Sequence, residues 1–469
     1  MILLLSLLCL LAGTFILKNI RIGAAAGILI QLAYILAGTG WQDLHTAAMV
    51  NGMVITLELA ILLFGAVAFY RFLLNNQRLD FLDQFVTTSP SRPYLLITYC
   101  FFLGSFFEGI AGFGVPPILL IPLLAKSGFK PLTSVVVALS GSINAVIFGA
   151  LGAPLTIGLG ITELNETINI LMIINACSCL AMPFILTYLY SKIEDVPVAW
   201  NKVLPMHLGA GFIYYVLFFL GSRFTVEYPA VIAGSIGMIL FMVIYNPTVR
   251  TWGIRFWFTS FWPYCLLIAL LLSSKLLLAN FSFVVPGGTK FVSAYQPGLI
   301  FVLCIAVISL IAGISRQRVE VADAIHKSAQ RTIQSALTIL MLIIFSQLVR
   351  WEMVDYIGLF IARQSEYLEP YLLMAFGVLG AFLTGSATMS NLLLNGLLTN
   401  TTAHVSLGTA MLHSGSVAGN AIALQNIVMA RSAVDERILD SEVFRYTSRT
   451  LIICLICISL STALWLMMD

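Results

Sequence analysis

Charged residues are scarce in this chain. Asp, Glu, Lys and Arg make up 10% of its 469 residues, whereas hydrophobic residues make up 60%. A soluble globular protein carries about 25% charged residues. The composition therefore excludes an ordinary soluble fold and predicts an all-α polytopic membrane protein. The net charge of +3 gives no indication of nucleic-acid binding, because charge in such a protein is read connection by connection.

Long polar segments and metal-ligand clusters are also lacking. The longest connections between apolar spans have about 20 residues, which leaves no room for a soluble ATPase domain, and the pattern GxxxxGK[ST] does not occur. The 8 cysteines lie in apolar spans without an accompanying histidine cluster, so we expect core thiols rather than a metal site. No nucleophile–base set is evident. We therefore expect neither a cofactor nor an enzyme.

The N-terminus lacks the features of a cleaved signal peptide. Residues 2–17 are apolar, but the first positive charges, Lys18 and Arg21, follow this run instead of preceding it. We expect a retained first span with its N-terminus outside. Further whole spans are expected near residues 22–40, 47–72, 168–191, 203–221, 228–245, 259–280, 294–314, 332–350 and 447–467.

Two apolar segments, residues 94–160 and 370–430, interrupt themselves with glycine and proline. The first segment carries these interruptions at Gly109, Gly112, Gly114, Pro116, Pro117, Gly149, Gly152 and Pro154. Lipid-exposed chain cannot break in this way, because the freed backbone groups would have no hydrogen-bond partner. Broken helices at membrane depth are instead buried in protein or line a binding cavity.

The two broken segments resemble each other. GSFFEG at residues 104–109 reads as GAFLTG at 380–385, and SGSINA at 140–145 reads as SGSVAGNA at 414–421. The two offsets are 276 and 274 residues, so the order and the spacing are both kept. We interpret the segments as two copies of one unit within a single membrane domain.

Positive charges alternate between the connections. The connections that hold most of the Lys and Arg are residues 18–21, 71–93, 192–202, 246–258, 315–331 and 431–449. The connections between them hold only Arg223, Lys290 and Arg363. By the positive-inside rule, the basic set is cytoplasmic and both termini are external.

The same charges orient the two broken segments. The first is entered from a basic connection and left through the acidic residues 162–167, whereas the second is entered from an acidic connection and left through a basic one. They are therefore inverted repeats with discontinuous or re-entrant helices, an architecture common in secondary transporters. Each crosses the membrane once with a re-entrant hairpin or three times, which gives about 12 to 14 transmembrane segments.

Ionisable side chains inside apolar segments are candidates for proton coupling. Glu108 lies at the first break, between Phe107 and Gly109. A charge at the centre of a membrane helix costs at least about 2.5 kcal/mol, so a carboxyl group there can gain and lose a proton. The alternative is a structural glutamate that is hydrogen-bonded to the break. Glu58, within the span 47–72, and His413, in the second SGS region, are further candidates.

Small polar side chains gather at the breaks. Hydroxyl and amide groups, together with the partial positive charge of about half an electron at a helix N-terminus, suit an anion with a carboxylate. The alternative is that these hydroxyls cap their own helices. The candidates for substrate binding are Thr384, Ser386, Thr388, Ser390 and Asn391 in the second segment and Ser140, Ser142 and Asn144 in the first.

The broken segments carry long motifs. FFEGIAGFGVPP, then GFKPL and FGALGAPLTIG, resembles the L-lactate permease family, and so does GAFLTGSATMSN, then SGSVAGN, Gln425 and FRYT. The resemblance implies a proton-coupled symporter for lactate and related 2-hydroxy monocarboxylates, such as glycolate, in the bacterial cytoplasmic membrane. It also implies that Glu108 matches the glutamate of EGxAGFG, that Ser386, Thr388, Ser390 and Asn391 match GSDTxSN, and that Gln425 joins the substrate-binding candidates.

The chain departs from this family pattern in places. Ala387 stands where the family usually has an aspartate, and Asn420 stands where it usually has a lysine. Residues 141–144 replace an Asn-Thr-containing segment, and the chain is somewhat shorter than is usual. The paired loss is charge-neutral, but it removes a possible substrate cation or proton relay, and so it bears on the substrate more than on transport.

We therefore expect a secondary active transporter of a small monocarboxylate, working by proton symport, whose partners are this anion, protons and the lipid bilayer. One alternative is a transporter of the same fold for a different small organic anion. Another, from a different class, is an anion channel or a membrane-embedded enzyme. A channel would show flux without saturation or concentrative uptake, and the lack of a nucleophile–base set or metal-ligand cluster disfavours an enzyme. Uptake of labelled carboxylates into proteoliposomes, with and without a pH gradient, separates them.

Overall fold

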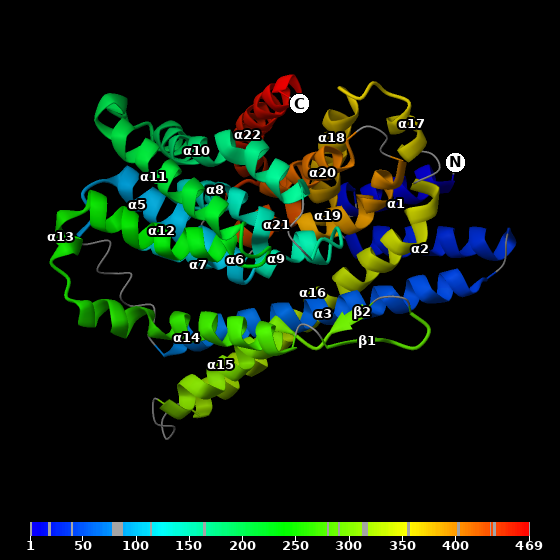
Figure 1. The fold of residues 1–469 in the computed structure, drawn as a ribbon, viewed down its shortest axis with the longest axis horizontal. Coiled ribbons are helices and arrows are strands. Elements are labelled where there is room, and N and C mark those ends of the chain that lie inside the picture. Colours follow the sequence, from blue (N-terminus) through cyan, green and yellow to red (C-terminus); the bar gives the residue numbers. More distant parts are fainter. Residues whose placement is uncertain are drawn as a thin grey trace. The chain divides into compact units, whose positions relative to one another are not determined.

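The structure is a computed structural model. It describes residues 2–16, 20–38, 41–76, 88–112, 115–162, 166–278, 281–288, 291–311, 318–353, 357–400, 404–431, 433–434 and 438–468. The chain forms two compact units, one made of residues 1–84 and 251–352 and the other of residues 85–250 and 353–469 (Figure 1). Residues 113–114 of the first predicted repeat and 401–403 of the second lie outside the described residues.

The first unit contains long apolar helices and one small hairpin. Its elements are α1 (Ile2–Phe15), α2 (Ile20–Ala37), α3 (Asp43–Asn75), α14 (Ile254–Leu278), β1 (Ser282–Val284), β2 (Phe291–Ser293), α15 (Pro297–Ile311) and α16 (Arg318–Met353). The strands are antiparallel, with Phe283 opposite Val292. Helix α1 packs on α2, and α15 packs on both α3 and α14.

The second unit contains both predicted repeats. Its elements before residue 251 are α5 (Arg92–Leu96), the π-helix η1 (Ile97–Leu103), α6 (Gly104–Ile110), α7 (Val115–Lys126), α8 (Pro131–Gly141), the 3₁₀ helix η2 (Ile143–Phe148), α9 (Gly149–Thr156), α10 (Glu166–Glu194), α11 (Trp200–Gly221), α12 (Pro229–Tyr245) and α13 (Pro247–Arg250). The later ones are α17 (Leu359–Ala362), α18 (Glu369–Thr384), α19 (Ala387–Leu394), the 3₁₀ helices η4 (Asn395–Asn400) and η5 (Asn420–Ile422), α20 (Val405–Gly419), α21 (Leu424–Arg431) and α22 (Asp440–Met468).

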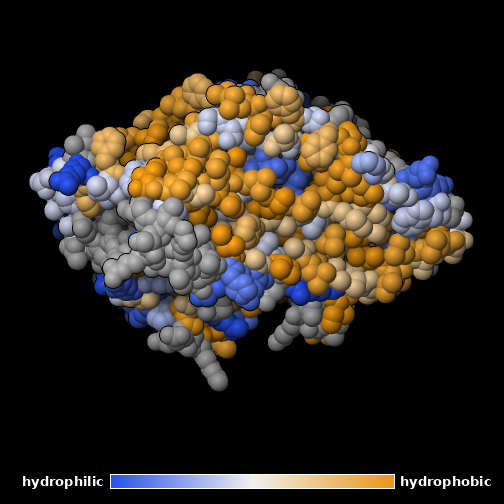
Figure 2. Space-filling model, turned by 90° about the horizontal axis from the view of Figure 1, so that it is seen from below, coloured by the Kyte–Doolittle hydropathy of each residue, from blue (hydrophilic) through white to orange (hydrophobic). Residues whose placement is uncertain are grey.

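The helices have the length and the surface of membrane spans. In the described residues, 6 helices are long and apolar enough to cross a bilayer, and shorter apolar helices accompany them. Large apolar side chains are exposed at four-residue intervals on α22, namely Ile452, Ile456, Leu460 and Leu464, and Figure 2 shows hydrophobic side chains over most of the face that it draws. These features confirm the predicted all-α integral membrane fold.

The two predicted repeats have the same order of elements. A long helix ends at a glycine break, a short helix follows, and a buried helix then leads through a 3₁₀ turn into a last short helix. Gly141 of α8 lies against the Cys100 carbonyl, and Gly415 of α20 lies against the Met374 carbonyl. Both members of this contact are 274 residues apart between the copies. The agreement supports duplicated units over residues 94–160 and 370–430.

Each repeat also contacts the long helix that follows the other repeat. Ser140 of α8 shares a hydrogen bond of 3.0 Å with Thr450 of α22. Reciprocally, the Asn175 amide of α10 donates to Ser414 of α20 over 2.8 Å. Ser140 and Ser414 are the first residues of the duplicated SGS motifs. Equivalent serines of the two repeats therefore form a hydrogen bond with the long helix that follows the other repeat.

The two repeats run in opposite directions along α10. The backbone N–H of Lys130, at the start of α8, donates to Glu194 at the C-terminal end of α10 over 2.9 Å. Ser406, at the start of α20, donates to Glu166 at the N-terminal end of α10 over 3.2 Å. Equivalent helices of the two repeats therefore begin at opposite ends of the same helix, as the inverted-repeat prediction requires.

Contacts of Arg92 decide how the first repeat begins. The Arg92 guanidinium, at the start of α5, donates to the carbonyl of Ser127, just beyond the end of α7, and stacks over the Phe129 ring at 4.8 Å. The chain therefore runs inward through α5, η1 and α6, turns at the break, and returns through α7, so that the end of α7 lies beside the start of α5. Of the two arrangements left open by the sequence, the re-entrant hairpin is the one present.

Candidate functional site

The site begins with two helix ends that glycine makes possible. Helix α6 ends at Ile110, and Gly112 beyond it has a φ of +56°. Helix α18 ends at Thr384, and Gly385 beyond it has a φ of +73°. Residues with a side chain rarely adopt this left-handed conformation, which commonly closes a helix C-terminus. Both chain reversals lie at the edge of one space.

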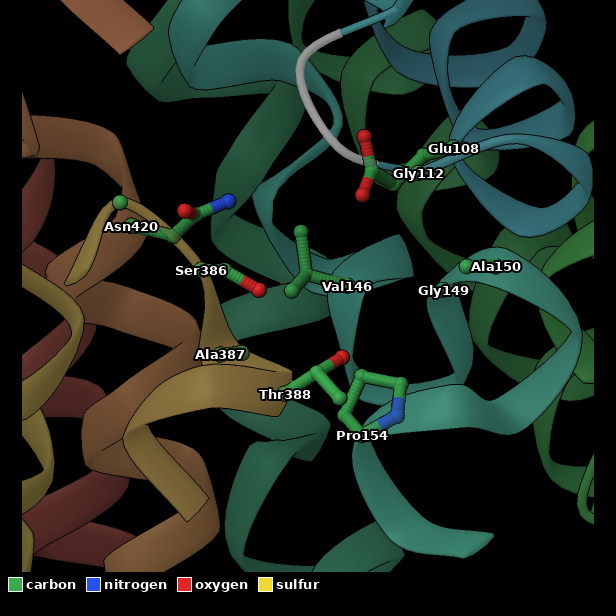
Figure 3. A pocket seen from close by; sticks show the side chains of 11 residues that line it. Glu108, Gly112, Val146, Gly149, Ala150, Pro154, Ser386, Ala387, Thr388 and Asn420 are labelled. Atoms are coloured by element: carbon green, nitrogen blue, oxygen red, sulfur yellow. The ribbon is translucent and has the colours of Figure 1, made fainter. Parts of the chain in front are cut away.

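This space, which we call the first chamber, comprises about 280 Å³ that no atom fills, part of which is open to solvent. Its polar side chains are Glu108, Ser386, Thr388 and Asn420. Figure 3 shows all four around Val146. The remaining wall is apolar or backbone: Gly112, Val146, Gly149, Ala150, Pro154, Gly385 and Ala387. Residues from both repeats therefore share one pocket.

Glu108 is the acidic group of the first chamber. Its side chain is 5% exposed, and no hydrogen bond or ion pair joins its carboxylate to another residue in the described part of the chain. A Cβ atom added to Gly149 would lie 3.2 Å from Glu108 Oε1, so this glycine leaves room for the carboxylate. A buried carboxyl group without a partner favours its neutral, protonated form.

The N-terminus of α19 faces Glu108 across the first chamber. Ser386 is the N-cap, and its hydroxyl accepts a long hydrogen bond of 3.5 Å from the Met389 N–H. The first N–H groups of a helix have no partner within the helix, and they carry partial positive charge. No Lys, Arg or His is found among the described residues that line the chamber. An anion would therefore be held by N–H and hydroxyl donors.

A second space adjoins the first. This second chamber comprises about 310 Å³ that no atom fills, part of which is open to solvent, and it shares Glu108, Val146 and Asn420 with the first chamber. Its other lining residues are Pro117, Leu139, Ser142, Ile143 and Asn426. Ser142 was predicted as a substrate-binding residue, and it lies in this chamber instead of with Ser386 and Thr388.

The wall opposite α19 contains an unusual stretch of backbone. Ala150 and Leu151 have φ values of 45° and 53°, and Gly152 has 76°. A left-handed conformation costs a residue with a side chain about 1–2 kcal/mol. Both side chains are buried, and Ala150 lines the first chamber. Packing therefore holds strained backbone at the site, a pattern that favours a functional segment.

A hydrogen-bonded bridge joins the two repeats beside the first chamber. The Asn391 amide of α19 donates to the Pro154 carbonyl of α9 and to His413 Nδ1, in each case over 2.9 Å. The other ring nitrogen, Nε2, donates to the Ile147 carbonyl over 2.9 Å. Because one ring nitrogen accepts and the other donates, this arrangement needs a neutral imidazole. Asn391 and His413 thus hold the repeats together and do not line either chamber.

Several other predicted binding residues serve the packing of helices. Asn144 accepts from the Ser178 hydroxyl over 2.8 Å, and Ser140 is bonded to Thr450 as described above. Ser390 contacts Ser416 at 2.8 Å between α19 and α20, and Thr384 donates to Gly380 in its own helix. Gln425 lies behind Gly385, whose added Cβ would be 2.9 Å from the Gln425 Oε1. None of these five lines either chamber.

Of the three proton-coupling candidates, Glu108 alone lines the chambers. Glu58 is half-buried on α3, in the first unit. Val146 and Asn426 also line the chambers, but the sequence did not predict them, because neither residue belongs to a motif that marks the site. Asn420 was noted but not assigned to the site, although its position matches Asn144 at the 276-residue offset.

Comparisons with known proteins agree on a family. The profile of a family described as L-lactate permease matches residues 1–259 and 266–468. The L-lactate permease of Streptococcus iniae is 22% identical over 339 residues, 66% of this chain and 70% of that protein. That of Halalkalibacterium halodurans is 24% identical over 390 residues, 73% of this chain and 72% of that protein. The glycolate permease GlcA of Escherichia coli is 28% identical over 242 residues, 49% of this chain and 42% of that protein.

Two solved structures share a distant likeness. The YdaH transporter of Alcanivorax borkumensis has a TM-score of 0.47 and 14% identity, covering 92% of this chain and 90% of that one. MtrF of Neisseria gonorrhoeae has a TM-score of 0.39 and 15% identity, covering 93% and 84%. At this level of likeness neither structure indicates what this chain transports.

Proposed function

This chain belongs to the L-lactate permease family, and we propose that it is a secondary active transporter that carries a small monocarboxylate together with a proton. The substrates that we expect are lactate and glycolate, the acids after which its relatives are named. The observation that carries the proposal is the first chamber, in which a buried carboxyl group faces a helix N-terminus with no basic side chain among the described lining residues.

The substrate carboxylate fits the α19 side of the chamber. Backbone N–H groups at the start of α19 and the hydroxyls of Ser386 and Thr388 are donors suited to it. The Asn420 amide can bond a 2-hydroxyl group, while Val146 and Ala150 offer an apolar wall to a methyl group. Because donors are few and the space is small, the chamber favours a short 2-hydroxy acid over a dicarboxylate or a long-chain acid.

Glu108 supplies the coupling. Two negative charges about 4 Å apart repel by about 4 kcal/mol at an effective dielectric constant of 20, which is roughly a thousandfold in affinity. An anionic substrate therefore binds well only when Glu108 is protonated. Loss of that proton on the far side of the membrane expels the anion by repulsion, so substrate and proton move together.

The orientation follows from the charges at the ends of α10. Arg92, Lys130 and Lys192 all lie near the C-terminal end of α10, where α5 and α8 also begin. By the positive-inside rule we assign this end to the cytoplasm of a bacterial inner membrane and both chain termini to the outside. Glu166, at the opposite end of α10, is then external.

Transport by purified protein in proteoliposomes tests the proposal. An alkaline interior should drive accumulation of labelled L-lactate and glycolate above the external concentration, with saturation. Glu108→Gln, which mimics the protonated form, should abolish this uphill uptake and keep exchange of internal for external substrate. Glu366→Gln is the matched control and should keep uphill uptake, because it makes the same change at an exposed position that lines neither chamber.

The other outcomes are equally informative. Accumulation by Glu108→Gln in response to the pH gradient would exclude Glu108 as the coupling residue. Flux that rises without saturation and never exceeds equilibrium would indicate a channel. Uptake of neither acid by the unmodified protein would show that the substrate is a different anion.

A further inference from the structure

The two chambers meet at three side chains, Glu108, Val146 and Asn420, which line both. Figure 3 shows Glu108 and Asn420 on either side of Val146 in the first chamber. The second chamber continues beyond these residues, between α7, α8 and α21. Val146 is 5% exposed and carries no polar group, so its side chain is an apolar partition between two partly polar spaces.

The second chamber is built like the first with the repeats exchanged. The first chamber uses α19, the short helix after the break in the second repeat, and α9, the last helix of the first repeat. The second uses Pro117 of α7, the short helix after the break in the first repeat, and Asn426 of α21, the last helix of the second. Helix α9 contacts α19, and α21 contacts α7.

From this exchange we infer that the second chamber is a second site for the same small monocarboxylate, reached past Val146. The inference rests on the proposed function, because it takes the substrate class from the first chamber. It adds a site, a partition and a direction of movement to that proposal.

The side chains of the second chamber suit the same ligand, with a lower affinity than the first chamber. The Ser142 hydroxyl is buried and makes no hydrogen bond to another residue in the described parts of the chain, so it is available to a carboxylate or a hydroxyl group. Asn426 donates to the backbone and side-chain oxygens of Asn420, over 3.1 and 2.8 Å, which fixes the shared residue. Leu139 and Ile143 give the apolar side of the space.

The chambers face opposite ends of α10. Helix α7 returns from the break to Ser127, beside Arg92 and close to the start of α8, which is bonded to Glu194. The second chamber therefore lies toward the C-terminal end of α10. Helix α9 leads instead toward Glu166, to which the start of α20 is bonded, so the first chamber lies toward the N-terminal end. A substrate that moves between the chambers past Val146 progresses across the membrane.

Sided chemical modification tests the second site. In a full-length variant without native cysteines, Ala387→Cys and Ile143→Cys report on the first and second chambers, because these residues line the chambers without supplying a polar side chain to the ligand. A membrane-impermeant anionic methanethiosulfonate is added to either face of oriented proteoliposomes. We expect Ala387→Cys to react from the external face and Ile143→Cys from the cytoplasmic face. L-lactate at about ten times its half-saturation concentration for uptake should slow both reactions at least about fivefold.

Val146 variants test the partition separately. Val146→Phe should reduce uptake of L-lactate at least about tenfold, because the larger side chain fills the passage between the chambers. Protection of Ala387→Cys by lactate should change by no more than about threefold, because the donors of the first site stay in place. Val243→Phe, at an exposed apolar position on α12, is the matched control and should keep uptake.

Each failure has its own meaning. Reaction of Ile143→Cys from the external face, no reaction from either face, or no protection by lactate would overturn the second site even when the parent accumulates lactate. Equal loss of uptake and of Ala387→Cys protection in Val146→Phe would overturn the partition. A parent protein that neither accumulates nor binds lactate or glycolate would instead overturn the proposed function.

Discussion

Removal of the Asn391 amide should destabilise the join between the two repeats. In Asn391→Ala, the Pro154 carbonyl and His413 Nδ1 each lose a donor at 2.9 Å, and both acceptors are buried. A buried group that loses its partner costs about 1–3 kcal/mol, whereas hydrogen bonds between membrane helices average about 0.6 kcal/mol and reach about 1.7. For two lost bonds the first figure gives about 2–6 kcal/mol and the second about 1–3 kcal/mol. The two ranges overlap at about 2–3 kcal/mol, which is the loss of unfolding free energy that we expect.

Thermal unfolding in detergent measures this loss. A maleimide dye that fluoresces on reaction with thiols reports the transition, because Cys100, Cys179 and Cys454 are buried in the folded protein. The midpoint of Asn391→Ala should fall by several degrees. Asn201 is exposed, and its side-chain oxygen accepts a hydrogen bond from the N–H of the next residue, Lys202. It gives the control Asn201→Ala, whose midpoint should stay within about a degree of the parent's.

A double-mutant cycle isolates the contact itself. Asn391→Ala and His413→Ala should each destabilise the protein, and the double variant should cost less than their sum by about 1 kcal/mol, because the shared hydrogen bond can be lost only once. Strict additivity of the two single variants, or an Asn391→Ala midpoint equal to that of the control, would refute the bridge.

Two other predictions concern a helix break and the topology. Gly112→Ala should lower the unfolding midpoint more than Gly160→Ala, since both force an alanine to a φ above +50° but only the first meets the Ala150 Cβ, at 2.8 Å; equal midpoints in the same dye assay would contradict this. A cysteine at Thr162, in a variant without native cysteines, should react with an impermeant reagent from outside intact cells; labelling only after permeabilisation would reverse the assigned orientation.

The sequence could predict those features that depend on composition or on repeated motifs. Apolar spans and scarce charge predict a polytopic helical protein, and the echoed glycine and serine motifs predict two repeats. Glu108, Ser386 and Thr388 were assigned to the site because a carboxylate or hydroxyl beside a glycine break is costly unless it is used. All three line the first chamber.

The remaining assignments depend on which way a helical side chain points. Asn144 and Ser390 are as polar as Ser386, but they face neighbouring helices and bond to Ser178 and Ser416. A motif does not distinguish a helix face that meets a cavity from one that meets another helix. Val146 could not be found at all, because an apolar residue that separates two chambers looks in sequence like any residue of a membrane span.

The reversal at residues 150–152 has no sequence signal either. Only its glycine suggests a left-handed backbone, whereas Ala150 and Leu151 adopt it because the surrounding packing imposes it. The strain is confined to one copy: among the described residues of the second repeat, Gly385 is the sole position with positive φ. The duplicated units are thus alike in topology and unlike in stored energy.

That inequality bears on the equilibrium between the two states of the proposed carrier. When inverted repeats exchange conformations, the outward- and inward-facing states would be equal in free energy if the copies were identical. Two left-handed residues in one copy store about 2–4 kcal/mol, and a difference of about 1.4 kcal/mol already makes one state tenfold more populated. Apparent affinity scales with the fraction of molecules in the competent state. In the proposed carrier, a state that relieved the strain at Ala150 and Leu151 would be favoured over the other state, and the half-saturation concentration for entry would then differ from that for exit.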